Sequence, residues 1–359
     1  MDINPIDLPL PELGSSSVIN DDILWVRMPL PFELDHINLY LLKDGDGYAL
    51  VDTGIGTSTT EAHWHTIFEQ LGTQLTKVIV THMHPDHIGM AGWLTEKFKV
   101  PLYMSHDEYF VARSIFAGAQ GASQWQDEQF YIRCGFDEDY IQKVLSNRKG
   151  MKAVIRPIPL SFERLSEGDT IQIGKHNWKI MIGRGHSPEH ICLYNEQQHW
   201  LISGDHILPR ISPNIGVYST EPNANSLQKY LTTLPQFLEL PADTLVFPSH
   251  KEPITGLHTR VQELIDHHHN HLHHLKDFCE TPRTAIECLP VLFKRELSHH
   301  NMFFAIAECL SHLNYLMHSK HVIRRISETG AYNYTATSMA LNLSKDSDAR
   351  FSEEQPLQT

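Results

Sequence analysis

The sequence predicts an α+β fold in which helices cover the outer faces of β-sheets. Between about residues 23 and 250, short apolar stretches typical of strands are mixed with stretches of helical periodicity. Strands and helices in this order pack as layers around a common core. After Gly256 the apolar residues instead follow one helical stripe, which indicates a smaller helical module. A chain of 359 residues is long enough for both parts.

The first half of the larger part is expected to contain three strands and then helix, strand, helix and strand. Gly45-Asp46-Gly47 supplies a turn between the second and third strands. The second helix starts at His87, because apolar residues recur after it at near-helical spacing. In chain order these elements are residues 23–30, 37–42, 48–54, 58–71, 77–81, 87–98 and 100–105.

Residues 106–150 form an insertion with a helical tendency and many aromatic side chains. Two interpretations are open: the insertion closes over an acyl chain of the substrate, or it is a helical hairpin that buries its aromatics in its own core. Further strands are expected at residues 153–160, 170–173, 178–182, 199–205 and 244–250, with a helix at 226–240.

The domain organisation follows from these elements. Residues 1–22 are an acidic, proline-rich N-terminal segment, and residues 23–256 form the larger domain. Residues 257–335 combine helices at 257–275, 283–293 and 302–317 with a hairpin around Gly330, an order similar to a winged-helix module. Residues 336–359 are polar and aperiodic, and a disordered tail is expected.

Charge and composition limit the partners. With 29 basic and 43 acidic residues the net charge is −14, so nucleic acid is not an expected partner unless a local basic patch exists. The helix at residues 302–317 contains no lysine or arginine, which favours packing or homodimer formation for this module over RNA binding. Five scattered cysteines without CxxC spacing, no signal peptide and no long apolar run predict a cytoplasmic protein without a membrane segment.

The segment Thr81-His-Met-His-Pro-Asp-His87 concentrates three histidines and an aspartate directly after a predicted strand. A solvated polar loop is one interpretation. A metal site is the other, because His82 and His84 lie on the same side of an extended chain, while Asp86 and His87 turn toward a second point.

Three further candidate ligands follow predicted strands in the same way, namely His186, Asp205 and His250. The chain thus offers five histidines and two aspartates, enough for two cations with a carboxylate between them. Nitrogen and oxygen ligands favour zinc, and they also suit iron or manganese.

With these residues and the Val51-Asp-Thr-Gly54 motif, the chain resembles the metallo-β-lactamase superfamily, in the branch of glyoxalase II and the quorum-signal lactonases. The resemblance implies a four-layer αββα sandwich with a dinuclear metal centre at one edge of the sheets. It further implies that His82, His84 and His186 bind the first metal, that Asp86, His87 and His250 bind the second, and that Asp205 bridges them. True β-lactamases of the superfamily commonly have cysteine where this chain has Asp205, so antibiotic hydrolysis is not expected.

The expected function is that of a metal-dependent hydrolase. A metal-bound hydroxide, assisted by Asp86 and Asp205, would cleave a thioester, ester or lactone of a small molecule. A phosphodiesterase or endoribonuclease is the first alternative, because some superfamily members with a similar C-terminal module cut RNA. A signal-binding protein that keeps its metals without turnover is the second.

Other residues have weaker signals. Asp52 is expected to accept hydrogen bonds from the ligand loop, or merely to form the turn before Gly54, and His190 and Ser187 are expected to support His186. Arg210 and Tyr218 are candidate substrate contacts, although their proline-rich segment is also typical of a structural loop. The run from His267 to His274 has histidines on one helix flank, which suits either a solvated face or adventitious metal binding.

Overall fold

The computed structural model describes residues 2–117, 125–146, 154–294 and 296–343. They form two compact units, each built from three segments of the chain. The first unit takes its residues from Met1–Ala122, Arg148–Pro213 and Gln236–Gln262, and the second from Ser123–Asn147, Asn214–Pro235 and Glu263–Thr359. Most of the expected disordered tail, residues 344–359, lies outside the described residues.

The first unit contains two seven-stranded sheets. In the first sheet the order is β2-β3-β4-β5-β6-β7-β8, and the neighbours from β5 onward run parallel. These strands are β2 (Ser15–Asn20), β3 (Ile23–Pro29), β4 (His36–Asp44), β5 (Gly47–Val51), β6 (Leu75–Ile79), β7 (Leu102–Met104) and β8 (Glu163–Arg164).

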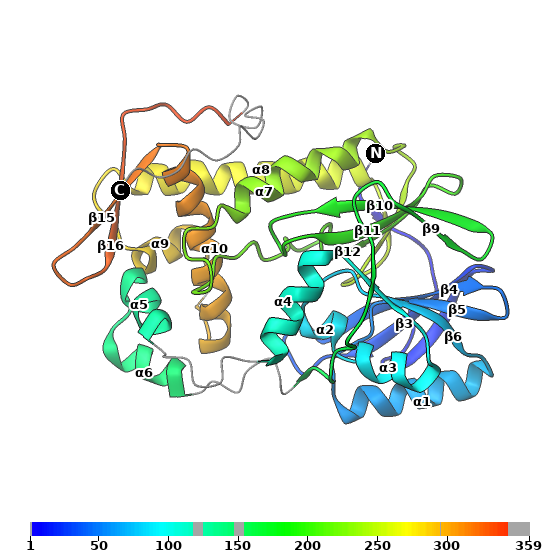
Figure 1. Ribbon diagram of the computed structural model, residues 1–359. Coiled ribbons are helices and arrows are strands. Elements are labelled where there is room, and N and C mark those ends of the chain that lie inside the picture. The colour runs from blue at the N-terminus through cyan, green and yellow to red at the C-terminus, as the bar shows by residue number, and fades with distance from the viewer. Residues whose placement is uncertain (1, 118–124, 147–153, 295, 344–359) are drawn as a thin grey trace. The chain divides into compact units, whose positions relative to one another are not determined.

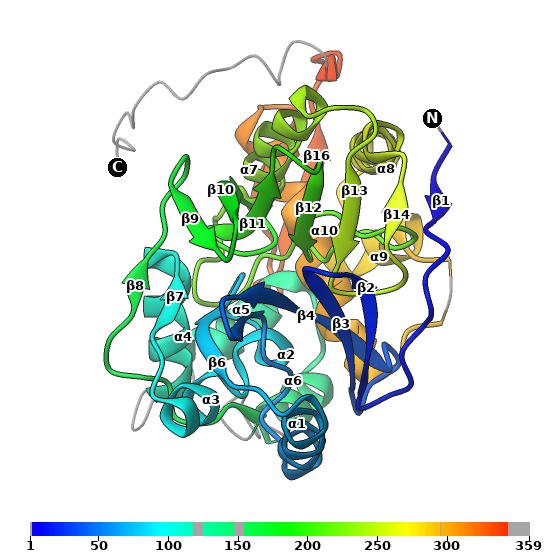
Figure 2. The ribbon, with the colours of Figure 1, turned by 90° about the vertical axis from the view of Figure 1, so that its right-hand side faces the viewer.

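The second sheet has the order β1-β14-β13-β12-β11-β10-β9, and within it β12 and β13 run parallel. Its strands are β1 (Asn4–Pro5), β9 (Thr170–Ile173), β10 (His176–Gly183), β11 (His190–Asn195), β12 (Trp200–Gly204), β13 (Leu245–Pro248) and β14 (Ile254–Thr255). Figure 2 shows the two sheets one above the other.

Side-chain alternation explains why the first sheet is buried on both faces. Along β3, Trp25 packs with Trp178 and Phe247 of the second sheet, whereas Val26 packs with the core under the helices. The same alternation continues on β4, where Tyr40 faces the second sheet and Leu41 faces the helices. Successive side chains of a strand point to opposite faces, so one apolar strand serves two cores.

Four helices cover the outer face of the first sheet (Figure 1). They are α1 (Ser58–Leu71), α2 (Pro85–Ile88), α3 (Ala91–Phe98) and α4 (His106–Ala117). The bounds of α1 confirm the predicted helix: the Thr57 side chain accepts the N–H of Thr60 at its start, and Gly72 ends it in the left-handed conformation.

The predicted helix from His87 is two helices instead. Thr53 Oγ1 accepts a hydrogen bond from the N–H of Met90 and donates one to the carbonyl of His87, which interrupts the helical bonding between α2 and α3. Gly89 also lies so close to the backbone that an added Cβ would be 2.4 Å from the Gly56 nitrogen. The break therefore fixes the end of the ligand-bearing loop against β5.

Two other predictions need correction. The predicted strand at residues 153–160 is absent from its described part, residues 154–160, where Pro157 and Pro159 cannot donate to a strand partner. The helix predicted at residues 226–240 ends as α7 (Ser226–Thr233) and continues as a 3₁₀ helix, η2 (Leu234–Glu239). Strands β2 and β11 and the two-residue strands β1, β8 and β14 had no counterpart in the sequence-based prediction.

In the second unit, helices pack around a short hairpin (Figure 1). The elements are α5 (Trp125–Cys134), α6 (Glu138–Ser146), α7, most of α8 (Leu257–Phe278), α9 (Ala285–Leu292), α10 (His299–His318), β15 (Val322–Ile326) and β16 (Tyr332–Ala336). The predicted hairpin around Gly330 is confirmed by the antiparallel pairing of β15 with β16.

All five cysteines are buried free thiols. Among the helices that the structure describes, none combines the length and the apolar character needed to cross a membrane.

Candidate metal centre

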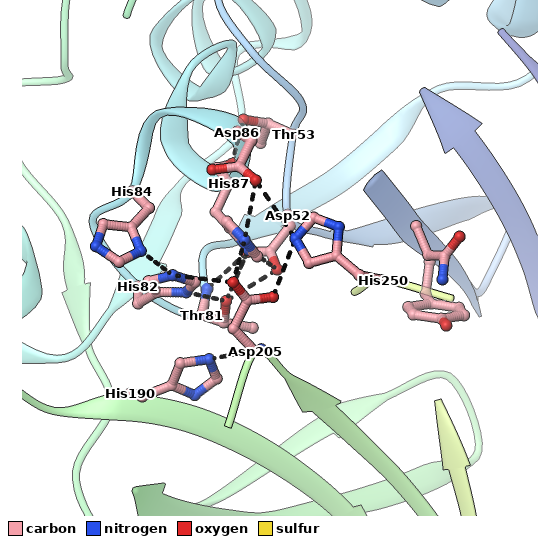
Figure 3. Close-up of polar contacts among 12 residues, drawn as sticks. Asp52, Thr53, Thr81, His82, His84, Asp86, His87, His190, Asp205 and His250 are labelled. Carbon is pink, nitrogen blue, oxygen red and sulfur yellow. Dashed lines mark hydrogen bonds and ion pairs between the residues drawn. The ribbon is translucent and has the colours of Figure 1, made fainter. Parts of the chain in front are cut away.

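The seven candidate ligands all follow strand ends of the first unit. His82, His84, Asp86 and His87 lie between the end of β6 and α2, and His186 lies three residues after β10. Asp205 directly follows β12, and His250 follows β13 by two residues. Strands of both facing sheets end here, so residues separated by up to 168 positions meet at one edge (Figure 3).

The first cluster consists of His82, His84, His186 and Asp205. His82 Nε2 lies 2.9 Å from His84 Nδ1 and 3.2 Å from His186 Nε2. Asp205 Oδ2 is 3.5 Å from His186 Nε2. One ligand atom of each residue lies within 4.8 Å of all the others.

The second cluster consists of Asp86, His87 and His250. Asp86 Oδ2 is 3.5 Å from His250 Nε2 and 3.7 Å from His87 Nε2. Asp205 joins the two clusters, because its Oδ2 is also 3.5 Å from His87 Nε2 and its Oδ1 is 3.3 Å from His250 Nε2. A carboxylate in this place can bridge two cations.

The nitrogen and oxygen atoms of the two clusters are better placed to bind cations than to form hydrogen bonds with one another. Three imidazole nitrogens converge in the first cluster, and a single proton can satisfy only one pair of them. Their spacing is close to the roughly 3.3 Å expected between nitrogens that bind one tetrahedral zinc at about 2.0 Å. In the second cluster His87 Nε2 is buried without a hydrogen bond to any described residue, which a cation would remedy.

The protonation states of His82, His84 and Asp86 suit metal binding, whereas a metal would displace protons from His87 and His250. The aspartates outweigh burial and raise the pKa of His87 and that of His250, the latter to about 10. Burial, reinforced by the neighbouring histidines, lowers the pKa of His82 well below its usual value and that of His84 to about 3. Burial would raise the pKa of Asp86, but His87 and His250 outweigh it and lower this pKa to about 2. Neutral imidazoles and ionised carboxylates are the forms in which these side chains bind metals.

Asp52 orients the ligand loop. It lies at the end of β5 with a φ of 58°, a left-handed conformation for a non-glycine residue. Its Oδ1 accepts the backbone N–H of Thr81 at 2.8 Å, and its Oδ2 lies 2.8 Å from Nδ1 of His87. Nδ1 of His87 therefore carries the hydrogen, which directs a free Nε2 toward Asp86 and Asp205.

His190 and Gly204 position the bridging carboxylate. Nε2 of His190 accepts the backbone N–H of Asp205 at 3.0 Å, while its ring stacks on His82 with centroids 4.6 Å apart. Gly204 has a φ of 54°, and a Cβ added to it would lie 2.4 Å from the His190 ring. Only glycine lets β12 turn here while His190 remains in contact.

Three residues of β4 hold His250, and no sequence motif indicated them. The carbonyl of His36 accepts a hydrogen bond from His250 Nδ1 at 2.8 Å, which leaves Nε2 to face the aspartates. The Asn38 amide donates to the carbonyls of Pro248 and Lys251, and the Tyr40 hydroxyl donates to Pro248. They are single polar residues in an apolar strand, without a motif.

Glu108 of α4 is a further residue that sequence reasoning missed. Its Oε1 accepts the Ser187 hydroxyl at 2.6 Å and the Glu189 N–H at 2.8 Å, and its Oε2 accepts the Met83 N–H at 2.9 Å. Met83 lies between His82 and His84, and Ser187 follows His186. One buried carboxylate thus ties together the two loops that supply the first cluster.

The candidate substrate contacts have partners of their own. Arg210 is exposed and lies 3.7 Å from Glu252. The Tyr218 hydroxyl, which belongs to the second unit, donates to Asn214 Oδ1 at 3.1 Å. Their role in substrate binding stays a prediction. In α5 and the turn that follows it, Tyr131 and Phe136 are buried and their rings contact each other, so these aromatics of the insertion are part of the interior of the second unit.

Comparison with known proteins agrees with this fold and site. A sequence profile of the metallo-beta-lactamase superfamily matches residues 33–250, and a profile of the metallo-beta-lactamase-like C-terminal domain matches residues 272–337. The fold and the two His/Asp clusters define a metallo-hydrolase whose site fits two divalent ions. The chain belongs to the metallo-beta-lactamase superfamily, and its fold class is the αββα sandwich of that superfamily.

A beta-lactamase domain protein from Burkholderia ambifaria has a similar solved structure. The two chains are 38% identical with a TM-score of 0.85, and the match covers 92% of this chain and 96% of the other. The probable metallo-hydrolase YqjP of Bacillus subtilis is 26% identical over 82% of this chain and 92% of its own. A hydroxyacylglutathione hydrolase of Bdellovibrio bacteriovorus is 25% identical over 49% of each chain.

Proposed function

We propose that this protein hydrolyses a thioester, ester or lactone of a small carboxylic acid with two divalent metal ions. The observation that carries the proposal is the position of Asp205, whose two carboxylate oxygens lie 3.3–3.5 Å from histidines of both clusters. The distant hydroxyacylglutathione hydrolase relative supports a carboxylic substrate. We propose zinc as the metal, because five of the seven ligands are imidazoles.

A pair of divalent ions supplies a hydroxide near neutral pH and a Lewis acid for the substrate carbonyl. The protein supplies the rest. His82 and His84 present neutral nitrogens from the loop after β6, His186 joins them from the loop after β10, and Asp205 holds the two clusters at a set separation. Asp86 and Asp205 remain ionised at neutral pH because neighbouring histidines outweigh the effect of burial and lower both pKa values. Each carboxylate can accept a hydrogen bond from a water and orient it.

A substrate panel tests the bond that is cleaved. We expect purified, zinc-loaded protein to hydrolyse acyl-thioesters, acyl-homoserine lactones or aryl esters faster than bis-p-nitrophenyl phosphate. A higher kcat/KM for the phosphodiester would replace the proposal with a phosphodiesterase. Bound metal without turnover of any panel member would instead favour the non-catalytic binding protein.

The variant His84→Ala links the metal to the reaction. His84 contributes one of three converging nitrogens, so its loss should remove metal from the first cluster and lower kcat by at least about 100-fold. His65→Ala, on the exposed face of α1, is the matched control and should keep both metal and activity. Full activity of His84→Ala would contradict the proposed role of the first cluster.

A further inference from the structure

The second unit contains another group of metal-binding side chains, formed by His267 and His271 of α8 and Glu308 of α10. One ligand atom of each lies within 4.8 Å of the other two. The two histidines are four residues apart, so they lie one above the other on the same face of α8, with ring centroids 4.1 Å apart. Glu308 approaches them from the neighbouring helix.

The environment of Glu308 favours a cation. Glu308 lies in the middle part of α10 and is only 7% exposed. The described hydrogen bond of its carboxylate is a long one, 3.4 Å from the Asn214 amide to Oε2. Burial accordingly raises the pKa of Glu308 to about 7. A carboxylate in a buried site is costly unless a positive charge compensates it, and a divalent ion supplies such a charge.

The histidine side of the group has an unsatisfied atom as well. Nδ1 of His271 is buried and makes no hydrogen bond to any described residue. His267 and His271 are both half-buried, so a small ion can reach them from solvent. An imidazole whose nitrogen lacks a hydrogen-bond partner and faces a carboxylate less than 5 Å away is well placed to bind a metal.

Two neighbouring histidines, His268 and His312, form a hydrogen bond with each other instead. Nδ1 of His312 lies 2.8 Å from the carbonyl of Glu308, which can only accept, so this nitrogen carries the hydrogen. Nε2 of His312 then accepts from Nδ1 of His268 at 3.1 Å. The pair His268–His312 therefore joins α8 to α10 by a hydrogen bond, and leaves His267, His271 and Glu308 as the ligand set.

Other residues hold the carboxylate in place. The Asn214 amide that donates to Glu308 also donates to the carbonyl of Phe304 at 3.2 Å, and its oxygen accepts the Tyr218 hydroxyl. The Tyr218 ring stacks on Phe303 with centroids 5.5 Å apart. Metal ligands are commonly oriented by such hydrogen bonds from behind. In this arrangement Asn214 and Tyr218 hold Glu308 in place, a role that does not require contact with the substrate.

We propose that His267, His271 and Glu308 bind a third divalent cation, which links α8 to α10 in the second unit. Two imidazoles and one carboxylate suit Zn²⁺ or Fe²⁺ and are unsuited to Ca²⁺ or Mg²⁺, which prefer oxygen ligands. Three protein ligands leave a coordination position for water. The proposal is independent of the reaction at the dinuclear centre.

Zinc binding to untagged protein tests the proposal. Metal-depleted wild type and variants are titrated with Zn²⁺ in a chelator-buffered series, and bound zinc is counted. We expect His271→Ala and Glu308→Gln each to bind one equivalent fewer than wild type, with circular dichroism confirming that they are folded. Asn214→Ala, which loses the bond to Glu308, should weaken this equivalent by about 10- to 100-fold.

Two controls distinguish a specific zinc site from nonspecific zinc binding by a histidine-rich helix. His273 and His274 are exposed on the same helix and are not part of the group, so the double variant His273→Gln/His274→Gln should bind as much zinc as wild type. A protein with the dinuclear centre removed by His84→Ala and His250→Ala should retain one equivalent. Unchanged zinc in His271→Ala, an equal loss in the double control variant, or no zinc in the protein without the dinuclear centre would overturn the proposal.

Discussion

Glu108 lies buried in the first turn of α4, where its carboxylate accepts hydrogen bonds from both loops of the first metal cluster. Without these bonds the partly buried N–H groups of Met83 and Glu189 would lose their acceptor. The loops would then be free to separate, and three nitrogens held 2.9–3.2 Å apart would lose their fixed geometry. Glu108 is thus a positioning residue for the cluster.

The variant Glu108→Ala measures this effect. We expect zinc affinity of the first cluster to fall about 10- to 100-fold, because residues that orient metal ligands commonly contribute this much. The free energy of unfolding should also fall by about 1–3 kcal/mol, owing to the partly buried donors left unpaired. Zinc titration and urea unfolding provide the two readouts. Asp107→Ala, at the exposed neighbouring position, is the control, and equal affinities of both variants would disprove the assignment.

The residues of the two clusters could be picked out from the sequence as candidate ligands, whereas the residues that hold them in place could not. His82 to His87 form a motif with regular spacing, and His186, Asp205 and His250 share its position after strands. Glu108 is one glutamate among many charged residues at a helix start, and its partners lie 25 and 79 positions away. A single polar side chain with distant partners leaves no local pattern to recognise.

At the scale of elements, β4 connects the two sheets at the metal centre. Besides pairing with β3 and β5, it binds the loop after β13 through the backbone and side chain of Asn38 and the hydroxyl of Tyr40. That loop carries His250. An inner strand of the first sheet therefore sets the position of a candidate ligand that belongs to the second sheet.

The variant Asn38→Asp tests this connection. The Asn38 amide donates to two carbonyls, and an aspartate oxygen in its place would face the carbonyls of Pro248 and Lys251 with no hydrogen to donate. We expect zinc in the second cluster to bind at least tenfold more weakly and the protein to unfold at a lower urea concentration. Asn38→Ala should have a smaller effect, since it removes the bonds without adding a charge. A larger loss of zinc affinity and stability in Asn38→Ala than in Asn38→Asp would contradict this account.

Elements with a strong local signal were predicted well. The helix α1 has an N-cap threonine and a terminal glycine, and the hairpin β15–β16 has Gly330 at its turn. Strand β11 was missed because all six of its residues are buried, so it has no alternation. Strand β2, with three serines, has little strand propensity and depends on its pairing with β3.

At the scale of the whole molecule, each unit draws on three separate segments of the chain. Residues from 123–147 and 214–235 join those from 263 onward, although the first two segments lie within the sequence region of the sheets. Tertiary packing between distant segments decides such a division. Linear composition and periodicity report only on neighbours along the chain, so they cannot predict it.

Buried histidines predict the pH dependence of stability. Nine histidines have a pKa lowered chiefly by burial, so below about pH 6.5 the unfolded chain binds protons that the folded protein does not. They are His36, His82, His84, His190, His206, His268, His269, His271 and His312. The opposite sign comes from four groups: burial raises the pKa of Glu108 and Glu308 to about 7, and neighbouring aspartates outweigh burial and raise the pKa of His87 and that of His250, the latter to about 10.

Metal-depleted protein should therefore unfold at a lower urea concentration at pH 5 than at pH 7. Unfolding followed by circular dichroism in a chelator-containing buffer measures the two midpoints. An equal or higher midpoint at pH 5 would show that the four groups with a raised pKa dominate instead. Zinc-loaded protein should be more stable than metal-depleted protein at pH 7 and lose this advantage on acidification, since protons compete with the metal for the imidazoles.

The central claim is that seven side chains from four loops of the first unit hold a pair of cations. Anomalous diffraction from crystals of zinc-loaded protein, recorded on both sides of the zinc absorption edge, tests it most directly. We predict two peaks about 3.5–4 Å apart, one bound by His82, His84 and His186, the other by Asp86, His87 and His250, with Asp205 between them. A map without a peak among these residues in the fully loaded protein would contradict the account.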